Sequence, residues 1–180
     1  MNRTAIVSAL VAGSALVGAS YFLKSRRPGP RALASGIIPI ITPVIDLRVA
    51  EDVLEAMEHV PGDAVTVVLH TLGGCVTSCV LIANALREFP QSTAIVPYMA
   101  TSGGTLIALN ARQLQMGRSA ALSAVDPIVH GLRAKHLPEN PTDPMQVMAQ
   151  EYEGAITRYM RDTLAARLPG VDEEALWNAV

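Results

Sequence analysis

From residue 37 onward, short runs of apolar residues alternate with segments in which apolar residues recur at helical spacing. Strands are predicted where the apolar runs are short and rich in β-branched residues, at 37–44, 64–70, 93–96, 113–116 and 120–124. Helices are predicted where apolar positions recur every three or four residues, at 50–59, 76–87, 105–111 and 144–168. Because helices alternate with strands, the sequence predicts an α/β fold with a parallel sheet.

Ser102 lies where an extended run gives way to a helix. The run ends near Val96, and Gly103 and Gly104 follow the serine directly. Glycines leave a neighbouring hydroxyl unshielded, and the helix dipole points its positive end at the serine. This arrangement suits a nucleophile, although serine is also favoured at this position simply as the N-cap of the helix. Both interpretations stay open on this stretch alone.

A second pair of glycines, Gly73 and Gly74, follows the strand that ends at His70. The carboxyl ends of parallel strands open on one side of a sheet, so we expect the two glycine pairs to lie on the same side. The amides of Gly74 and Gly103 would then converge on one oxygen, as the donors of an oxyanion hole do. The alternative is a tight turn in which the glycines only permit a positive φ.

Three segments together resemble the serine dehydrogenase proteinase family, relatives of signal peptide peptidase A in the Clp protease and crotonase superfamily. They are residues 69–74 (LHTLGG), 98–109 (YMATSGGTLIAL) and 124–127 (AVDP). The resemblance implies a spiral of ββα units, a homo-oligomer, and a peptidase in which Ser102 is the nucleophile and Gly74 and Gly103 hold the oxyanion. Leu72 departs from the family, which usually has proline there, and Cys75 is also unexpected.

The general base is the least determined part of this site. Lys24 and Lys135 are the only lysines, and Lys24 adjoins the apolar N-terminal segment, so a Ser-Lys dyad requires Lys135. Burial would have to lower the pKa of its ammonium from about 10.4 toward neutrality before it could accept a proton. The competing interpretation is a solvated lysine in a loop, since prolines follow at positions 138 and 141.

Histidine is the alternative base. In a Ser-His-Asp arrangement His130 would take the proton and Asp126 would orient it, although His130 is displaced from the position expected of a Clp-type histidine. His70, beside the glycine pair, is expected to line the cleft or to hydrogen-bond the turn. His59 is expected to be the polar end of a helix.

The N-terminal segment predicts attachment to a membrane. Residues 5–23 carry no charge, and a helix of about 19 residues at about 1.5 Å each nearly spans a bilayer core. We therefore expect residues 1–24 to be a single-pass transmembrane anchor, with a cleaved signal or targeting segment as the alternative. The basic residues that follow favour a cytosolic domain. Residues 25–35 are predicted to be a linker, and 36–180 the hydrolase domain.

Composition narrows the remaining function classes. The chain has 180 residues, of which 50% are hydrophobic and 17% charged, enough for one domain-sized core. A net charge of −2 and 4% aromatic residues disfavour nucleic acid as a partner. No cofactor is expected, and no metal, because Cys75 and Cys79 have only His70 nearby as a further ligand. Cys75 is an alternative nucleophile.

These features predict a membrane-anchored serine endopeptidase that hydrolyses peptide or protein substrates through Ser102, with Lys135 as its base. A catalytically inactive crotonase-like binding or scaffold protein is the alternative, and the lack of a secure base is its main support. Such a protein would use the same cleft to hold acyl groups or partner segments.

Overall fold

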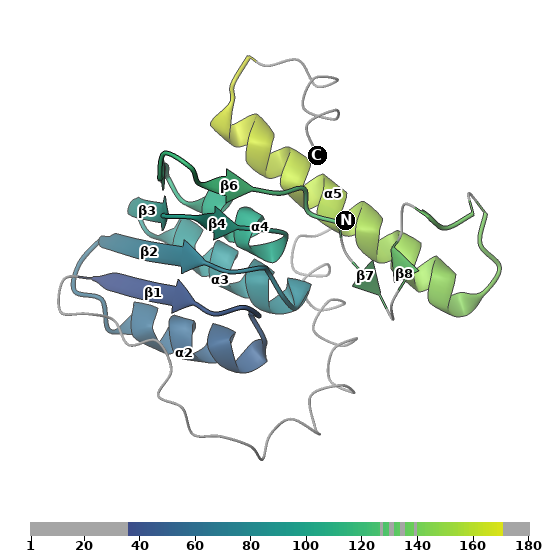
Figure 1. Cartoon of the computed structure of the whole chain (residues 1–180), viewed down its shortest axis with the longest axis horizontal. Coiled ribbons are helices and arrows are strands. Elements are labelled where there is room, and N and C mark those ends of the chain that lie inside the picture. The colour runs from purple at the N-terminus through teal and green to yellow at the C-terminus, as the bar shows by residue number, and fades with distance from the viewer. Residues whose placement is uncertain (1–35, 127, 130–131, 134–135, 139, 171–180) are drawn as a thin grey trace.

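The computed structural model describes residues 36–126, 128–129, 132–133, 136–138 and 140–170. The chain winds through strands and helices in alternation (Figure 1). The elements in these residues are β1 (Ile37–Ile41), α2 (Leu47–Glu58), β2 (Ala64–His70), α3 (Val76–Glu88), β3 (Gln91–Val96), β4 (Met99–Ala100), α4 (Gly103–Asn110), β5 (Gln113–Met116), β6 (Ala121–Leu122), β7 (Ile128–Val129), β8 (Leu132–Arg133) and α5 (Pro144–Arg167).

Four strands form the main sheet, in the order β1-β2-β3-β5 and all parallel. The register pairs Ile38 with Val67 and Val67 with Ala94. Alternate side chains on these strands are buried, as the period of two requires when helices cover one face. The α/β prediction with a parallel sheet is therefore confirmed.

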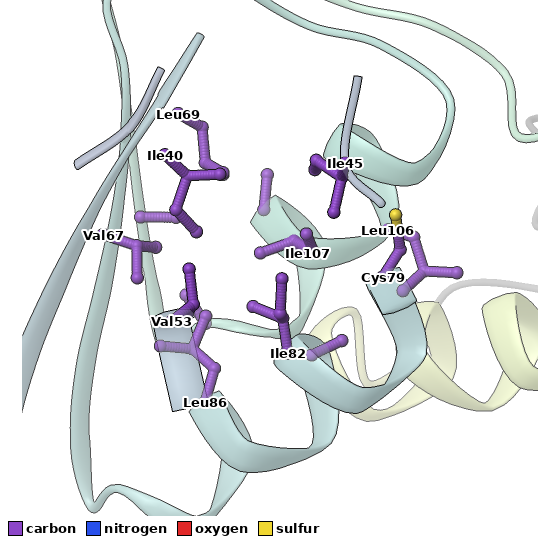
Figure 2. Close-up of a cluster of buried hydrophobic side chains, with 14 of the residues drawn as sticks. Ile40, Ile45, Val53, Val67, Leu69, Cys79, Ile82, Leu86, Leu106 and Ile107 are labelled. Atoms are coloured by element: carbon purple, nitrogen blue, oxygen red, sulfur yellow. The ribbon is translucent and has the colours of Figure 1, made fainter. Parts of the chain in front are cut away.

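The hydrophobic core lies between the sheet and the helices (Figure 2). Val67 and Leu69 of β2 face a layer that includes Val53 of α2, Ile82 of α3 and Ile107 of α4, all fully buried. Burying a side chain of this size contributes about 1.5–3 kcal/mol. Helix α3 packs on both α2 and α4, so the first turn of α4 is held by the same core.

A two-stranded parallel sheet of β4 and β6 adjoins the carboxyl end of β2, where Thr71 bridges to Ala100. This small sheet carries the chain from the main sheet into the turn that precedes α4 (Figure 1). Helix α5 lies beyond α4, with Ile156 and Met160 buried. Strands β7 and β8 form an antiparallel pair ahead of α5.

Several predicted boundaries shift for local reasons. The first strand ends at Ile41 rather than at residue 44, and α2 starts three residues earlier than predicted because Asp46 caps it, accepting a hydrogen bond from Val49 N at 2.9 Å. Strands β4, β7 and β8 were not predicted. The apolar stripe expected along the last helix is only partly buried, since Met145 and Met148 are exposed.

The N-terminal predictions concern residues that the structure does not describe. The anchor at 1–24 and the linker at 25–35 both lie outside the described residues. Among the helices of the described part of the chain, none is long and apolar enough to cross a membrane.

Candidate active site

Ser102 occupies a sharp turn between β4 and α4. Its backbone has φ 50° and ψ −118°, and it is the one non-glycine residue of the described chain with a positive φ. Such a conformation costs about 1–3 kcal/mol and persists only where the surroundings hold it. The side chain is half-buried and makes no capping hydrogen bond to α4. The interpretation of Ser102 as an ordinary N-cap residue is therefore not supported.

The two glycine corners, the turns at Gly73-Gly74 and Gly103-Gly104, lie against each other, as the sequence predicts. A methyl group on Gly73 would lie 2.8 Å from Ser102 Cβ and 3.0 Å from Gly103 N. A methyl group on Gly103 would lie 3.6 Å from Gly74 N. Gly73 also has a φ of +104°, which favours glycine. The close approach and the backbone conformation thus both require glycine at position 73.

The backbone amides of these corners can be accounted for one by one. In the run from residue 72 to 75, three amides have acceptors: those of Leu72, Gly73 and Cys75 donate to Pro43 O, Thr71 Oγ1 and Ile45 O. In the run from 101 to 104, the amides of Thr101, Ser102 and Gly104 donate to Thr71 O, Ser123 Oγ and Thr101 O. Of the eight amides in these two runs, those of Gly74 and Gly103 have no acceptor among the described residues. These are the amides that the sequence singles out.

The glycine turn is tied to the chain that follows β1. Leu72 N donates to Pro43 O at 3.2 Å, and Ile45 N donates to Gly73 O at 2.7 Å. A proline at position 72, which the resembling family usually has, could not make the first of these bonds because proline has no N–H. In this chain the turn is thus held at residue 72 by a hydrogen bond and not by the fixed φ of a proline.

An open cavity of about 300 Å³ lies beside the glycine turn. It is lined by Ile41, Thr42, Pro43, His70, Thr71, Leu72 and Met99. The two threonine hydroxyls of the lining are engaged with nearby backbone carbonyls, of Val44 and Gly73. Among the described residues of the lining there is no carboxylate, lysine or arginine, so the cavity presents mainly apolar surface.

His70, the last residue of β2, lies at this cavity. Its ring makes an edge-on contact with Tyr98, with centroids 5.8 Å apart, and its buried Nδ1 has no hydrogen-bond partner among the described residues. His70 thus lines the cavity rather than bonding the glycine turn through Nδ1. His59 caps the end of α2, as the sequence predicts, with its Nδ1 2.7 Å from Glu55 O.

The two candidate bases, Lys135 and His130, lie outside the described residues. Asp126, the carboxylate expected to orient His130, is described and half-buried. Within the described residues, the Ser102 hydroxyl has no hydrogen-bond partner. The choice between lysine and histidine therefore stays a prediction.

Ser123 and Thr105 are the residues at this site that the sequence did not reveal. Ser123 Oγ accepts a hydrogen bond from Ser102 N at 2.8 Å, and Ser123 N donates to Thr105 Oγ1 at 3.1 Å. Both depend on the pairing of β4 with β6, which brings Ser123 next to Ser102. Two-residue strands carry no periodicity, so the signal for this pairing was too short to detect.

The cysteines of α3 differ in their surroundings. Cys75 is exposed at the start of the helix, whereas Cys79 is fully buried. Burial, and to a smaller extent the neighbouring Cys75, raises the pKa of the Cys79 thiol to about 12. In the described part of the chain no three His, Cys, Asp or Glu side chains gather in a way that would hold a metal ion.

Curated relatives cover part of this chain. Two uncharacterized proteins of Methanocaldococcus jannaschii, MJ0137 and MJ1495, are 42% and 38% identical to it over 85 residues. Each alignment covers 46% of this chain, and 30% and 29% of the relatives, so the chain matches less than a third of their length.

Solved structures and a family profile extend the comparison. A point mutant of ClpP1 from Listeria monocytogenes matches with a TM-score of 0.58 and 16% identity, over 80% of this chain and 78% of that one. This likeness shows a ClpP-like fold. A family profile described as ClpP-like SDH-type serine proteinase matches residues 32–143, which is more than half of the chain and includes both glycine corners and Ser102. The chain therefore belongs to the family of ClpP-like SDH-type serine proteinases.

Proposed function

We propose that this protein is a serine endopeptidase in which Ser102 attacks the carbonyl carbon of a peptide bond. The observation that supports this most is the strained, half-buried Ser102 next to the two amides, of Gly74 and Gly103, that lack an acceptor among the described residues. Family membership points to the same reaction class. A serine with a purely structural role would have no need of either feature.

In the proposed mechanism the amides of Gly74 and Gly103 stabilise the negative oxygen of the tetrahedral intermediate. Each such donor contributes about 3–4 kcal/mol to the transition state. The Ser102 amide is not a donor in this scheme, because it is already bonded to Ser123 Oγ. Collapse of the intermediate releases the amine, and water then hydrolyses the acyl-enzyme.

We propose Lys135 as the base that takes the proton from Ser102, with His130 as the alternative. Lysine must be neutral to accept a proton, so its pKa would have to fall from about 10.4 toward about 7–8 in the assembled site. The same group would then protonate the leaving amine. A lysine base predicts activity that rises as the pH approaches that lowered pKa from below.

The open cavity favours substrates with apolar side chains near the scissile bond. Leu72, which lines it, is covalently joined to Gly73, and Gly73 lies against Ser102. The threonine hydroxyls of the lining already donate to backbone carbonyls, so a charged substrate side chain would lose its hydration and find only the His70 ring as a further polar side chain there. A bulky apolar side chain fills this space at no such cost.

Membrane anchoring by residues 1–24 and assembly into a homo-oligomer complete the proposal. Anchoring is supported by the uncharged segment at 5–23 alone. It is tested by asking whether the full chain stays with membranes after alkaline extraction while a form starting at residue 36 does not.

The catalytic proposal is tested with a fluorophosphonate probe, which bonds to activated serines. Wild-type protein should be labelled, Ser102→Ala should not, and Ser119→Ala, which removes an exposed serine from the turn before β6, should be labelled normally. Equal labelling of wild type and Ser102→Ala would overturn Ser102 as the nucleophile. Persistent alkylation-sensitive peptidase activity in Ser102→Ala would move the role to Cys75.

The base is tested in the same assay. Lys135→Ala should abolish labelling while His130→Ala spares it, and the opposite pattern would assign the proton transfer to histidine. A folded wild-type protein that is never labelled and cleaves no peptide would favour the alternative function, a binding or scaffold protein.

A further inference from the structure

The pairing of β4 with β6 brings a second serine to the nucleophile. The parallel register sets Met99 opposite Ala121 and Ala100 opposite Leu122, so the chain after β6 runs beside the turn at 101–102. Ser123 is the first residue beyond β6. Its Oγ lies 2.8 Å from Ser102 N, although the two residues are 21 positions apart in the sequence.

The direction of each hydrogen bond around Ser123 is determined. The Ser123 hydroxyl donates its proton to Ala124 O at 2.9 Å, so its oxygen is free to accept from Ser102 N. Ser123 N donates to Thr105 Oγ1 at 3.1 Å, and the Thr105 hydroxyl donates to Ala100 O at 2.8 Å. Both hydroxyl protons are therefore committed to carbonyl groups, and neither side chain is available as a nucleophile.

These bonds enclose the turn that contains Ser102. Ala100 precedes the nucleophile by two residues and Thr105 follows it by three, and both are buried and linked through the Thr105 hydroxyl. Ser123 joins this pair from a third segment and holds the Ser102 amide directly. A positive φ at a serine relaxes unless the surroundings hold it, and relaxation would turn the Ser102 side chain away from the amides of Gly74 and Gly103.

We infer that Ser123 and Thr105 act as a clamp that holds Ser102 in its reactive conformation, with Ser123 as a positioning residue. The inference rests on the peptidase proposed above, because only a reacting Ser102 gives the clamp a catalytic effect. The clamp also determines which amides serve the oxyanion: by engaging the Ser102 amide, Ser123 leaves Gly74 and Gly103 as the donors. Displacing the nucleophile lowers the rate of the reaction and leaves the affinity for the substrate unchanged.

The test compares Ser123→Ala, Ser123→Thr and the control Ser119→Ala in fluorophosphonate labelling. Ser123→Ala should lower the maximal labelling rate about 10- to 100-fold while the probe concentration for half-maximal rate stays unchanged. Ser123→Thr keeps a hydroxyl on the same carbon and should recover most of the rate. Ser119→Ala should equal wild type.

Three results would overturn the clamp. One is Ser123→Ala reacting at the wild-type rate, another is Ser123→Thr reacting as slowly as Ser123→Ala, and the third is an equal loss in probe affinity. If wild-type protein is not labelled at all, the peptidase proposal fails first. The clamp is then judged by hydrogen exchange of the Ser102 amide, which should be slow in wild type and fast in Ser123→Ala; equal exchange would refute it.

Discussion

The Cys79 thiol lies against the α carbon of Gly103, so closely that a methyl group on Gly103 would overlap with the sulfur atom. This contact joins α3 to the first turn of α4, and with it the core to the corner that holds Ser102. Cys79 is fully buried in the core, so moving its sulfur would disturb the side chains packed around it. Packing against Cys79 thus requires glycine at position 103.

Replacing Gly103 with alanine should therefore harm both stability and reactivity. Overpacking a rigid core costs about 1–3 kcal/mol, and the displaced turn should slow the labelling of Ser102. Urea denaturation and fluorophosphonate labelling would measure the two effects. The double variant Gly103→Ala with Cys79→Ala should recover part of the stability, because the sulfur is gone.

Gly154→Ala provides the matched control for this substitution. Gly154 lies inside α5, its added methyl would come no closer than 3.4 Å to Arg158 Nη1, and its φ is not positive. Alanine there should raise stability by about 0.5–1 kcal/mol. The packing argument fails if Gly103→Ala is as stable as Gly154→Ala.

The two thiols should differ in reactivity and give stability a dependence on alkaline pH. Folding raises the pKa of the Cys79 thiol from 9.0 to about 12, chiefly through burial and secondly through Cys75. The folded state keeps the proton that the unfolded state releases, so this stabilisation is complete below about pH 9 and is lost as the pH rises toward 12. Its slope is about 1.4 kcal/mol per pH unit.

Denaturation at about pH 8 and about pH 10 should show this loss in the wild type and not in Cys79→Ala. In the folded protein a thiol reagent should modify the exposed Cys75 at once and Cys79 only on unfolding. Equal modification of both cysteines in native conditions would contradict the burial of Cys79.

Asn110, the last residue of α4, should contribute strongly to the packing of α5 against α4. Its Oδ1 lies 3.3 Å from the Tyr159 hydroxyl and 3.4 Å from the Thr163 hydroxyl, and its Nδ2 donates to Leu106 O at 2.7 Å. Asn110→Leu would remove all three of these bonds, at a cost of about 0.5–1.5 kcal/mol for each, although the Tyr159 hydroxyl keeps Asn84 Oδ1 at 3.0 Å and the Thr163 hydroxyl keeps Tyr159 O at 2.9 Å. Tyr159→Phe removes a hydroxyl instead and should cost less, since Asn110 keeps its other bonds.

Urea denaturation of the two variants would measure this difference. An Asn110→Leu protein that is no less stable than Tyr159→Phe would show that the network contributes little.

Leu72 should determine the preference for apolar substrates. The side chain is 59% exposed beside the cavity, so Leu72→Glu should leave stability within about 0.5 kcal/mol of wild type. It places a carboxylate at an apolar site, and KM for peptides with bulky apolar side chains should rise about tenfold while kcat changes less.

Leu47→Glu supplies the comparison, since Leu47 is similarly exposed, at 48%, but lies on α2 outside the cavity lining. If both variants shift KM alike, or neither does, the cavity has no part in substrate choice.

The sequence predicted the elements that are specified by residues close together in the chain. The β-branched run before His70 and the periodic run after Cys75 predicted β2 and α3 to within one residue, and the glycine pairs marked the turns between strands and helices. It could not predict contacts that depend on register between distant short strands. Ser123 falls in the predicted strand 120–124, but only the pairing of β4 with β6 makes it a neighbour of Ser102.

The expected strand at 37–44 combines a local apolar pattern, which the sequence reveals, with irregular contacts to a distant segment, which it does not. Regular pairing stops at Ile41, yet the chain continues to bond its neighbour irregularly: Thr42 N donates to His70 O, and Cys75 N donates to Ile45 O. Pro43 cannot donate, which interrupts the ladder without ending the contact. Apolar pattern alone does not distinguish such a continuation from a regular strand.

That irregular continuation places residues 42–45 beside the proposed reaction centre. Residues 42–45 supply three of the partners that fix the loop around Gly73 and Gly74, through Pro43 O, Ile45 N and Ile45 O. A shortened form of the protein beginning at Asp46 would retain Ser102, both glycine pairs and the whole of α3. It would nevertheless lack β1 and leave the loop that we propose binds the scissile carbonyl without these three partners, so it should fold less cooperatively and turn over no substrate.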